Sequence, residues 1–154
     1  MGSRLLIAAR SGVDVRTWRE AVRAAADLLV EIGAAEPAYV DACVESVEKN
    51  GPYIVLTRGL ALAHARPEDG ALGVGLTVVR LAHPLDFLGA PNGPVDVVLG
   101  LCTPDAHAHL DVMRALARGL SGGLADRMRS APDTAHLEEL LKEVVPDGTE
   151  NVGA

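Results

Sequence analysis

Histidine is the residue type in this sequence that is best suited to chemistry near neutral pH. The chain has five, at His64, His83, His107, His109 and His136. The unperturbed pKa of an imidazole is about 6.5, so its neutral form can act as a base, a nucleophile or a metal ligand. The five differ in their sequence context, and that context decides which chemistry each can support.

His64 stands where a short apolar segment gives way to a loop. Side chains alternate along a strand, so Leu60, Leu62 and His64 share one side, while the three alanines of 60–65 share the other. A histidine at a strand end beside small residues is open to a reacting group or to a partner's side chain. The alternative is a capping histidine that hydrogen-bonds its own loop. Position alone leaves both interpretations open.

His107 and His109 have the residue type of a metal-binding pair, since histidine is a common zinc ligand. Their segment is predicted to be helical, and residues two apart on a helix point to nearly opposite sides. His109 aligns with Val112 and Leu116 on the inward face, whereas His107 lies on the outer face. His109 is therefore either a core residue or a ligand. A metallohydrolase that uses both of them together with His64 is the corresponding enzyme hypothesis.

Other catalytic patterns are absent from the sequence. It has no P-loop, no Gly-rich dinucleotide fingerprint after a strand and no GxSxG motif. His83 and His136 have no partner in sequence and are interpreted as structural or surface residues. Cys43 and Cys102 lie far apart without a metal-binding spacing, which favours a reduced, cytoplasmic setting. Apart from the histidine-based metallohydrolase hypothesis, these patterns give no reason to expect a cofactor or a metal.

The composition is that of a soluble protein with an aliphatic core. The chain has 154 residues, of which 49% are hydrophobic but only 3% aromatic, and its net charge is -7. This length suits one domain. The 14 lysines and arginines are scattered, which argues against a nucleic-acid partner, because such proteins carry a basic patch or stripe. The apolar run Leu5–Ala9 is too short to span a membrane.

Spacing and capping signals place the elements that must position the histidines. Thr17 and Glu20 form a capping box that begins a helix ending at Gly33, and a second helix runs from Pro37 to Asn50. We expect strands over 4–9, 53–56, 60–63, 74–81 and 95–101, and further helices over 103–120, 124–129 and 134–144.

Helices and strands interleave along the chain, so the predicted fold class is α/β. We expect a single-domain sandwich in which a mixed β-sheet is flanked by helices on both faces. The domain is expected to take in residues 1–145, and residues 146–154 are expected to form a mobile polar tail.

Two sequence runs carry a family resemblance. GPYIV at 51–55 and LALAHARPEDG at 60–70 resemble the active-site stretch of the mannitol/fructose-type EIIA domains of the bacterial phosphoenolpyruvate:sugar phosphotransferase system (PTS). Within that family the chain is most similar to the ascorbate-type branch. Supporting runs are WREAV at 18–22, the strand from Pro94 to Leu101, and His109-Leu110. The resemblance spans Val15 to Val144.

The resemblance implies a phosphotransferase activity with a phosphohistidine intermediate. By it, His64 accepts a phosphoryl group from the phosphocarrier protein HPr and passes it to an EIIB domain, whose acceptor is expected to be a cysteine. His109 matches the second active-site histidine, which is expected to hydrogen-bond the phosphoryl group. Arg66 is either a phosphate contact or a surface loop arginine. Phosphoryl transfer of this kind requires no metal and no cofactor, and the membrane component EIIC is involved only indirectly.

The sequence departs from the family pattern at two places. Ala63 stands where the family motif usually has proline, so the backbone before His64 is not fixed by a pyrrolidine ring. No arginine is found around 48–50, where some mannitol-type members carry one upstream of the active histidine, so that role is either absent or filled elsewhere, with Arg58 as the candidate.

The sequence therefore predicts a cytoplasmic EIIA component of a sugar PTS, for ascorbate or a related carbohydrate. The alternative is a regulatory EIIA-like phosphoprotein that controls a partner rather than feeding a transporter. Both hypotheses use the same histidine. The acidic charge suits brief docking with HPr, whose contact face is expected to be basic.

Overall fold

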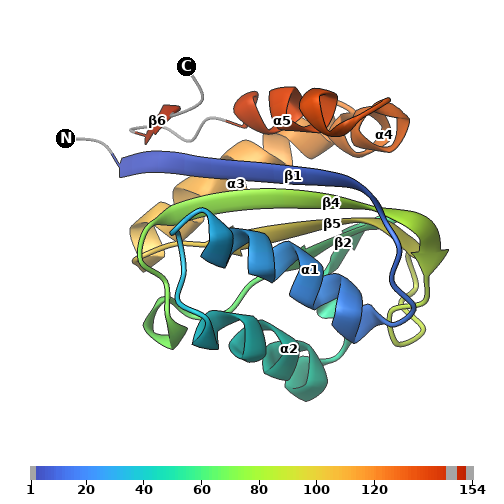
Figure 1. The fold of residues 1–154 in the computed structure, drawn as a ribbon, viewed down its shortest axis with the longest axis horizontal. Helices are drawn as coiled ribbons and strands as arrows, with labels where there is room; N and C mark the ends of the chain where they lie inside the picture. Colours follow the sequence, from blue (N-terminus) through green and yellow to red (C-terminus); the bar gives the residue numbers. More distant parts are fainter. Residues whose placement is uncertain (1–2, 145–148, 152–154) are drawn as a thin grey trace.

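The computed structural model describes residues 3–144 and 149–151 (Figure 1). In chain order the elements are β1 (Ser3–Val13), α1 (Trp18–Glu31), α2 (Ala38–Asn50), β2 (Val55–Thr57), β3 (Leu60–Ala63), β4 (Val74–Leu85), β5 (Val95–Cys102), α3 (Ala106–Ser121), α4 (Leu124–Ser130), α5 (Thr134–Lys142) and β6 (Thr149–Asn151). Single 3-10 turns cover Pro52–Ile54 and Pro67–Asp69.

The strands of the described residues form one sheet in the order β2-β3-β5-β4-β1-β6. β3 runs parallel to β5 and β1 parallel to β4, whereas β4 is antiparallel to β5. Helices α1 and α2 cover one face, and α3, α4 and α5 cover the other (Figure 1). The prediction of a mixed sheet between two helical layers is confirmed.

The two faces of the sheet carry separate apolar cores. Ala61 and Ala63 of β3 face α1 and α2, while Leu60 and Leu62 face the opposite helical layer. The alternation predicted for this segment is therefore correct. All four β3 residues are buried, so β3 is held from both sides and fixes the position of His64, which follows it.

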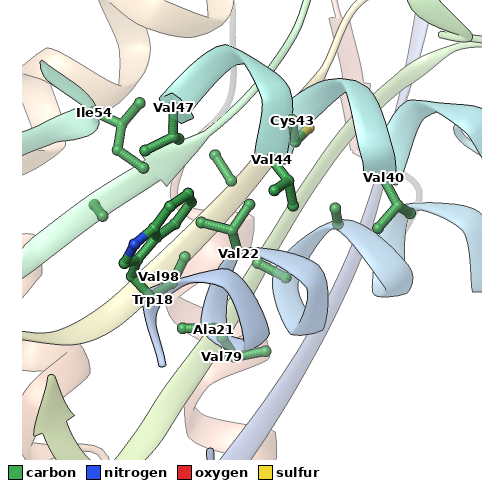
Figure 2. Packing of buried hydrophobic residues seen from close by; sticks show 14 of the residues in the cluster. Trp18, Ala21, Val22, Val40, Cys43, Val44, Val47, Ile54, Val79 and Val98 are labelled. Carbon is green, nitrogen blue, oxygen red and sulfur yellow. The ribbon is translucent and has the colours of Figure 1, made fainter. Parts of the chain in front are cut away.

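On the α1–α2 face, the two helices pack against each other as well as on the sheet. Trp18 and Val22 of α1 lie opposite Val44 and Val47 of α2 (Figure 2). Trp18 sits at the first residue of α1, where Thr17 caps the helix by accepting the N–H of Glu20 at 3.2 Å. The Thr17 half of the predicted capping box is thus present, while the Glu20 carboxylate accepts the Thr17 hydroxyl at 3.2 Å.

Helix α1 approaches the sheet unusually closely where it crosses β5. The Thr77 hydroxyl of β4 donates to the Ala25 carbonyl of α1 at 2.8 Å in a buried hydrogen bond. A methyl group at Gly100 of β5 would lie 2.5 Å from that hydroxyl oxygen and 2.8 Å from the same carbonyl oxygen. Only glycine therefore allows this helix–sheet distance.

Several element boundaries differ from those expected. Tyr53 and Ile54 lie in a 3-10 turn rather than a strand, because Pro52 begins a tight turn there. Strand β4 extends to Leu85, so His83 lies in a strand and not in a connection. Helix α3 begins at Ala106 instead of 103, because the Asp105 carboxylate accepts the N–H of Ala108 and caps it.

The ends of the chain are only partly described. Residues 149–151 form β6, which pairs in parallel with 3–5 of β1. The rest of the polar tail predicted for 146–154 lies outside the described residues. None of the helices in the described part of the chain has the length and apolar character needed to cross a bilayer.

The close approach at Gly100 yields a test of the fold. Gly100→Ala should destabilise the protein by about 1–3 kcal/mol, because the added methyl group overpacks the contact between α1 and the sheet. The midpoint of urea unfolding measures the loss. Gly73→Ala is the matched control, since a methyl group there meets no atom within 4 Å. Equal midpoints for the two variants would contradict the close-contact argument.

Candidate active site

The parallel pairing of β3 with β5 places two histidines at one edge of the sheet. His64 directly follows β3, and His109 lies in the first turn of α3, which follows β5. The carboxyl ends of parallel strands meet at the same edge, where α/β proteins commonly bind their ligands. The two imidazole centroids are 5.9 Å apart, with an angle of 40° between the ring planes.

The backbone fixes the orientation and tautomer of His64. Its Nδ1 lies 3.1 Å from the carbonyl oxygen of Leu62. A carbonyl oxygen can only accept, so Nδ1 is the protonated nitrogen of the neutral ring and Nε2 carries the lone pair. The ring is half-buried and borders an open cleft. This arrangement presents Nε2 as a nucleophile.

Tyr53 is a site residue that the sequence analysis assigned only to a strand. Its ring meets His64 edge-on, with centroids 5.8 Å apart at an angle of 77°. The Tyr53 hydroxyl is 3.1 Å from the Ser46 hydroxyl of α2. The signal in the sequence is Pro52, which begins the 3-10 turn that brings this ring to the histidine.

The cleft beside the histidines has a volume of about 600 Å³. It lies between the second half of α2, the turn after β3 and the start of α3. Its lining residues are Ala42, Glu45, Ser46, Lys49, Asn50, Tyr53, His64, Ala65, Arg66, Pro67, Asp69, Ala106 and His109. His64, His109 and Arg66, the three site residues predicted from the sequence, therefore border one cavity.

The cleft contains both cationic and anionic side chains. Lys49 and Arg66 supply positive charge, and Glu45 and Asp69 supply negative charge. Arg66 is 78% exposed at its side chain and lies 3.6 Å from Asp69 and 3.8 Å from Glu68. Exposed ion pairs of this kind contribute little stability, so the guanidinium can exchange them for a bound anion.

Arg58 is not part of this cleft. It lies in the turn between β2 and β3 and borders a different hollow, together with Pro91 and Arg129. The length of β3 separates this turn from His64. Arg58 is therefore not the substitute for the family arginine at this cleft, and the role is either absent or filled by another residue. Lys49 of α2 is a cation that borders the cleft.

The other three histidines lie away from this site. His107 is 87% exposed at its side chain and lies 3.3 Å from Asp111 on its own helix. His83 and His136 are exposed as well. The helical separation of His107 from His109 was thus predicted correctly. Within the described part of the chain, no three His, Cys, Asp or Glu side chains gather to form a metal site, which removes the geometric basis of the metallohydrolase hypothesis.

His109 is held in its neutral form by its surroundings. Burial lowers its pKa below the ordinary value of 6.5, and the adjacent His64 lowers it further. A neutral imidazole near pH 7 keeps one N–H donor and one acceptor. The site therefore pairs a nucleophilic nitrogen with a neutral hydrogen-bonding ring.

Comparison with known proteins gives a consistent set of similarities. The family model described as "Phosphoenolpyruvate-dependent sugar phosphotransferase system, EIIA 2" matches residues 8–144. The ascorbate-specific PTS system EIIA components of Escherichia coli (strain K12) and Shigella flexneri are each 41% identical over 103 residues, which is 67% of this chain and 67% of theirs.

Solved structures show the same fold. A putative PTS IIA (PtxA) from Streptococcus mutans has a TM-score of 0.77 at 29% identity, covering 89% of this chain and 88% of that one. The E. coli mannitol-specific cryptic phosphotransferase enzyme IIA CmtB has a TM-score of 0.77 at 27% identity, covering 87% and 90%. The E. coli enzyme IIA of the mannitol system, solved in complex with phosphorylated enzyme IIB, has a TM-score of 0.72 at 25% identity, covering 86% and 92%.

The pKa of His109 can be tested by titration. Its protonation midpoint should lie below 6.5, and in His64→Gln it should rise but stay below 6.5, because burial is the larger of the two causes. The other charged groups of the cleft, on Glu45, Lys49, Arg66 and Asp69, are unchanged in this variant. Chemical shifts of isotope-labelled histidines measure both midpoints.

The same depressed pKa has a consequence for stability. The unfolded chain binds the proton of His109 more tightly than the folded one, so this contribution to stability is complete above pH 6.5 and falls as the pH drops through the folded pKa. A protonation midpoint of His109 at or above 6.5, or one that does not move in His64→Gln, would contradict the assigned causes of the pKa shift.

Proposed function

Since the chain belongs to the EIIA type 2 family of the phosphoenolpyruvate-dependent sugar phosphotransferase system, we propose that it carries the phosphoryl group on Nε2 of His64. EIIA components are phosphotransferases that relay phosphoryl groups through a histidine, and this chain has that activity by family membership. The observation that supports His64 is the hydrogen bond from its Nδ1 to the Leu62 carbonyl, which leaves Nε2 unprotonated beside the cleft.

The proposed chemistry is two successive in-line displacements. In the first, the Nε2 lone pair attacks phosphorus, an N–P bond forms, and the bond from phosphorus to the donor breaks, its electron pair returning to the donor. In the second, a thiolate of the acceptor attacks phosphorus and the electron pair of the N–P bond returns to Nε2. Such transfers depend mainly on alignment and on donors to the phosphoryl oxygens.

His109, Lys49 and Arg66 are proposed to supply those donors. The neutral ring of His109, 5.9 Å from that of His64 between centroids, can donate one N–H to a phosphoryl oxygen. Lys49 and Arg66 border the same cleft and can add positive charge. Arg66 lies two residues after His64, and its exposed guanidinium lies 3.8 Å from Glu68 and 3.6 Å from Asp69, contacts that it can release.

The proposed donor is HPr and the proposed acceptor an EIIB domain. The E. coli mannitol IIA, which shares this fold, was solved with phosphorylated IIB, and this supports an EIIB partner. The names of the relatives at 41% identity support ascorbate or a related carbohydrate as the transported substrate. A cytoplasmic location is part of the proposal and is supported by two buried, free cysteines, Cys43 and Cys102.

The histidine assignment is tested by phosphorylation. Incubation with phosphoenolpyruvate, enzyme I and HPr should yield one acid-labile phosphohistidine, and His64→Ala should abolish the label because the accepting nitrogen is gone. Radiolabel retained on the protein measures it. The control is His107→Ala, which removes an exposed imidazole that does not border the cleft and should label normally. A labelled His64→Ala protein would overturn the assignment.

Transfer onward separates a transport role from a regulatory one. The phosphorylated protein should transfer its label to a purified ascorbate-type EIIB, and His109→Ala should slow this by about 10- to 100-fold, the value of one hydrogen bond to a charged group. Rapid-quench sampling of the two proteins measures the rates. Absence of transfer by the wild-type chain would favour the regulatory alternative. An unchanged rate in the variant would make His109 a packing residue.

A further inference from the structure

The hydroxyl of Tyr39 lies buried at the sheet edge directly behind His64. Tyr39 is the second residue of α2, and it is 1% exposed. Its hydroxyl oxygen accepts the N–H of Ala65 at 3.0 Å and lies 2.8 Å from the carbonyl oxygen of Leu101, to which it donates. One side chain of a helix therefore bonds the backbones that follow β3 and end β5.

This hydroxyl occupies the place of a missing bond in the sheet. In the parallel β3–β5 pair, the N–H of Val97 donates to the carbonyl of Gly59. In a parallel ladder every second residue of one strand bonds the other strand, so Val97, Leu99 and Leu101 are the β5 residues that would bond β3 and its continuation. In this pattern the carbonyl of Leu101 would accept the N–H of Ala65. The Tyr39 hydroxyl is inserted between these two groups. It ends the pairing after Ala63 and Gly100, and the chain leaves the sheet at His64.

The turn that follows His64 is also held at its far end. The N–H of Glu36 donates to the carbonyl of Gly70 at 2.8 Å, and the N–H of Leu72 donates to the carbonyl of Ala34 at the same distance. The segment before α2 thus anchors residues 70–72, while Tyr39 anchors Ala65. His64 itself lies between the end of β3 at Ala63 and the Tyr39 contact at Ala65, so the path of the backbone at His64 depends on that contact.

Burial raises the pKa of Tyr39 far above its ordinary value of 10.0. The hydroxyl therefore keeps its proton over the whole physiological range. A protonated hydroxyl can accept one hydrogen bond and donate another at the same time, which is what insertion between an N–H and a carbonyl requires.

We propose that the Tyr39 hydroxyl is a positioning group for phosphoryl transfer. By holding Ala65 apart from Leu101, it sets the turn in which Nδ1 of His64 reaches the Leu62 carbonyl, and it thereby selects Nε2 as the phosphorylated nitrogen. The selection of Nε2 rests on the proposed function. The control of the His64 tautomer by Tyr39 does not, because it concerns the unphosphorylated protein.

The test is Tyr39→Phe, which removes the oxygen and keeps the ring. The histidine ¹⁵N shifts of the unphosphorylated wild-type protein should show the Nδ1–H tautomer at His64, and the variant should show a mixture of tautomers. Phosphorylation by HPr should be about tenfold slower, because the bonds of the hydroxyl to Ala65 and Leu101 no longer set the backbone after His64. The matched control is Thr77→Val, which removes the buried hydroxyl of β4 that bonds α1 and should change neither the tautomer nor the rate.

Each outcome decides for or against the role of Tyr39. A wild-type tautomer in Tyr39→Phe, or an equal slowing in Thr77→Val, overturns it and leaves Tyr39 as a core residue. If Tyr39→Phe does not fold, 4-aminophenylalanine at position 39 fills the same space and still donates to Leu101, but it accepts poorly from Ala65. A partial shift of the tautomer supports the inference and no shift overturns it. If Tyr39→Phe shifts the tautomer of His64 but the wild-type protein takes up no phosphoryl label on His64, the proposed function is overturned and the role of Tyr39 in setting the tautomer is not.

Discussion

The parallel pairing of β3 with β5 is the constraint on which the site depends. Two parallel neighbours deliver their carboxyl ends to the same edge, so the residues that follow them become neighbours despite a separation of tens of residues in sequence. His64 comes from one end and, through the start of α3, His109 from the other. Both strands are buried between two helical layers, and the relative position of the two rings is therefore set by the core rather than by flexible loops.

The α1–α2 layer turns this edge into a cleft. Gly100 and Thr77 allow α1 to approach the sheet closely, and α2 packs on α1 through aliphatic contacts. The second half of α2 then forms the wall opposite His64, and its first turn supplies Tyr39 to the backbone behind that histidine. One helix thus both encloses the site and orients it, so packing on this face and chemistry at the edge are coupled.

Much of this arrangement could be predicted from the sequence. The alternation over 60–65 and the helical period around His109 fix which side each residue faces, because both periods are set by local backbone geometry. Tyr39 and Tyr53 escaped prediction as site residues for different reasons. Tyr39 occupies an apolar position of a helix, and its hydroxyl meets groups 26 and 62 residues away, which only the sheet topology brings together. Tyr53 follows Pro52, which begins a 3-10 turn at a place where the apolar residues predicted a strand.

A protein that relays a phosphoryl group must bind that group without making the phosphorylated state too stable to react with the acceptor. The charge distribution of the cleft meets that requirement. A phosphoryl dianion carried on Nε2 of His64, as proposed, would meet the cations of Lys49 and Arg66 together with the carboxylates of Glu45 and Asp69, whose formal charges cancel. His109 is held neutral, so in the proposed role it can add a hydrogen bond but no full charge. A more cationic pocket would stabilise the phosphorylated state more than the transition state and would slow departure to the acceptor. The balance of charges therefore favours transfer in both directions over storage.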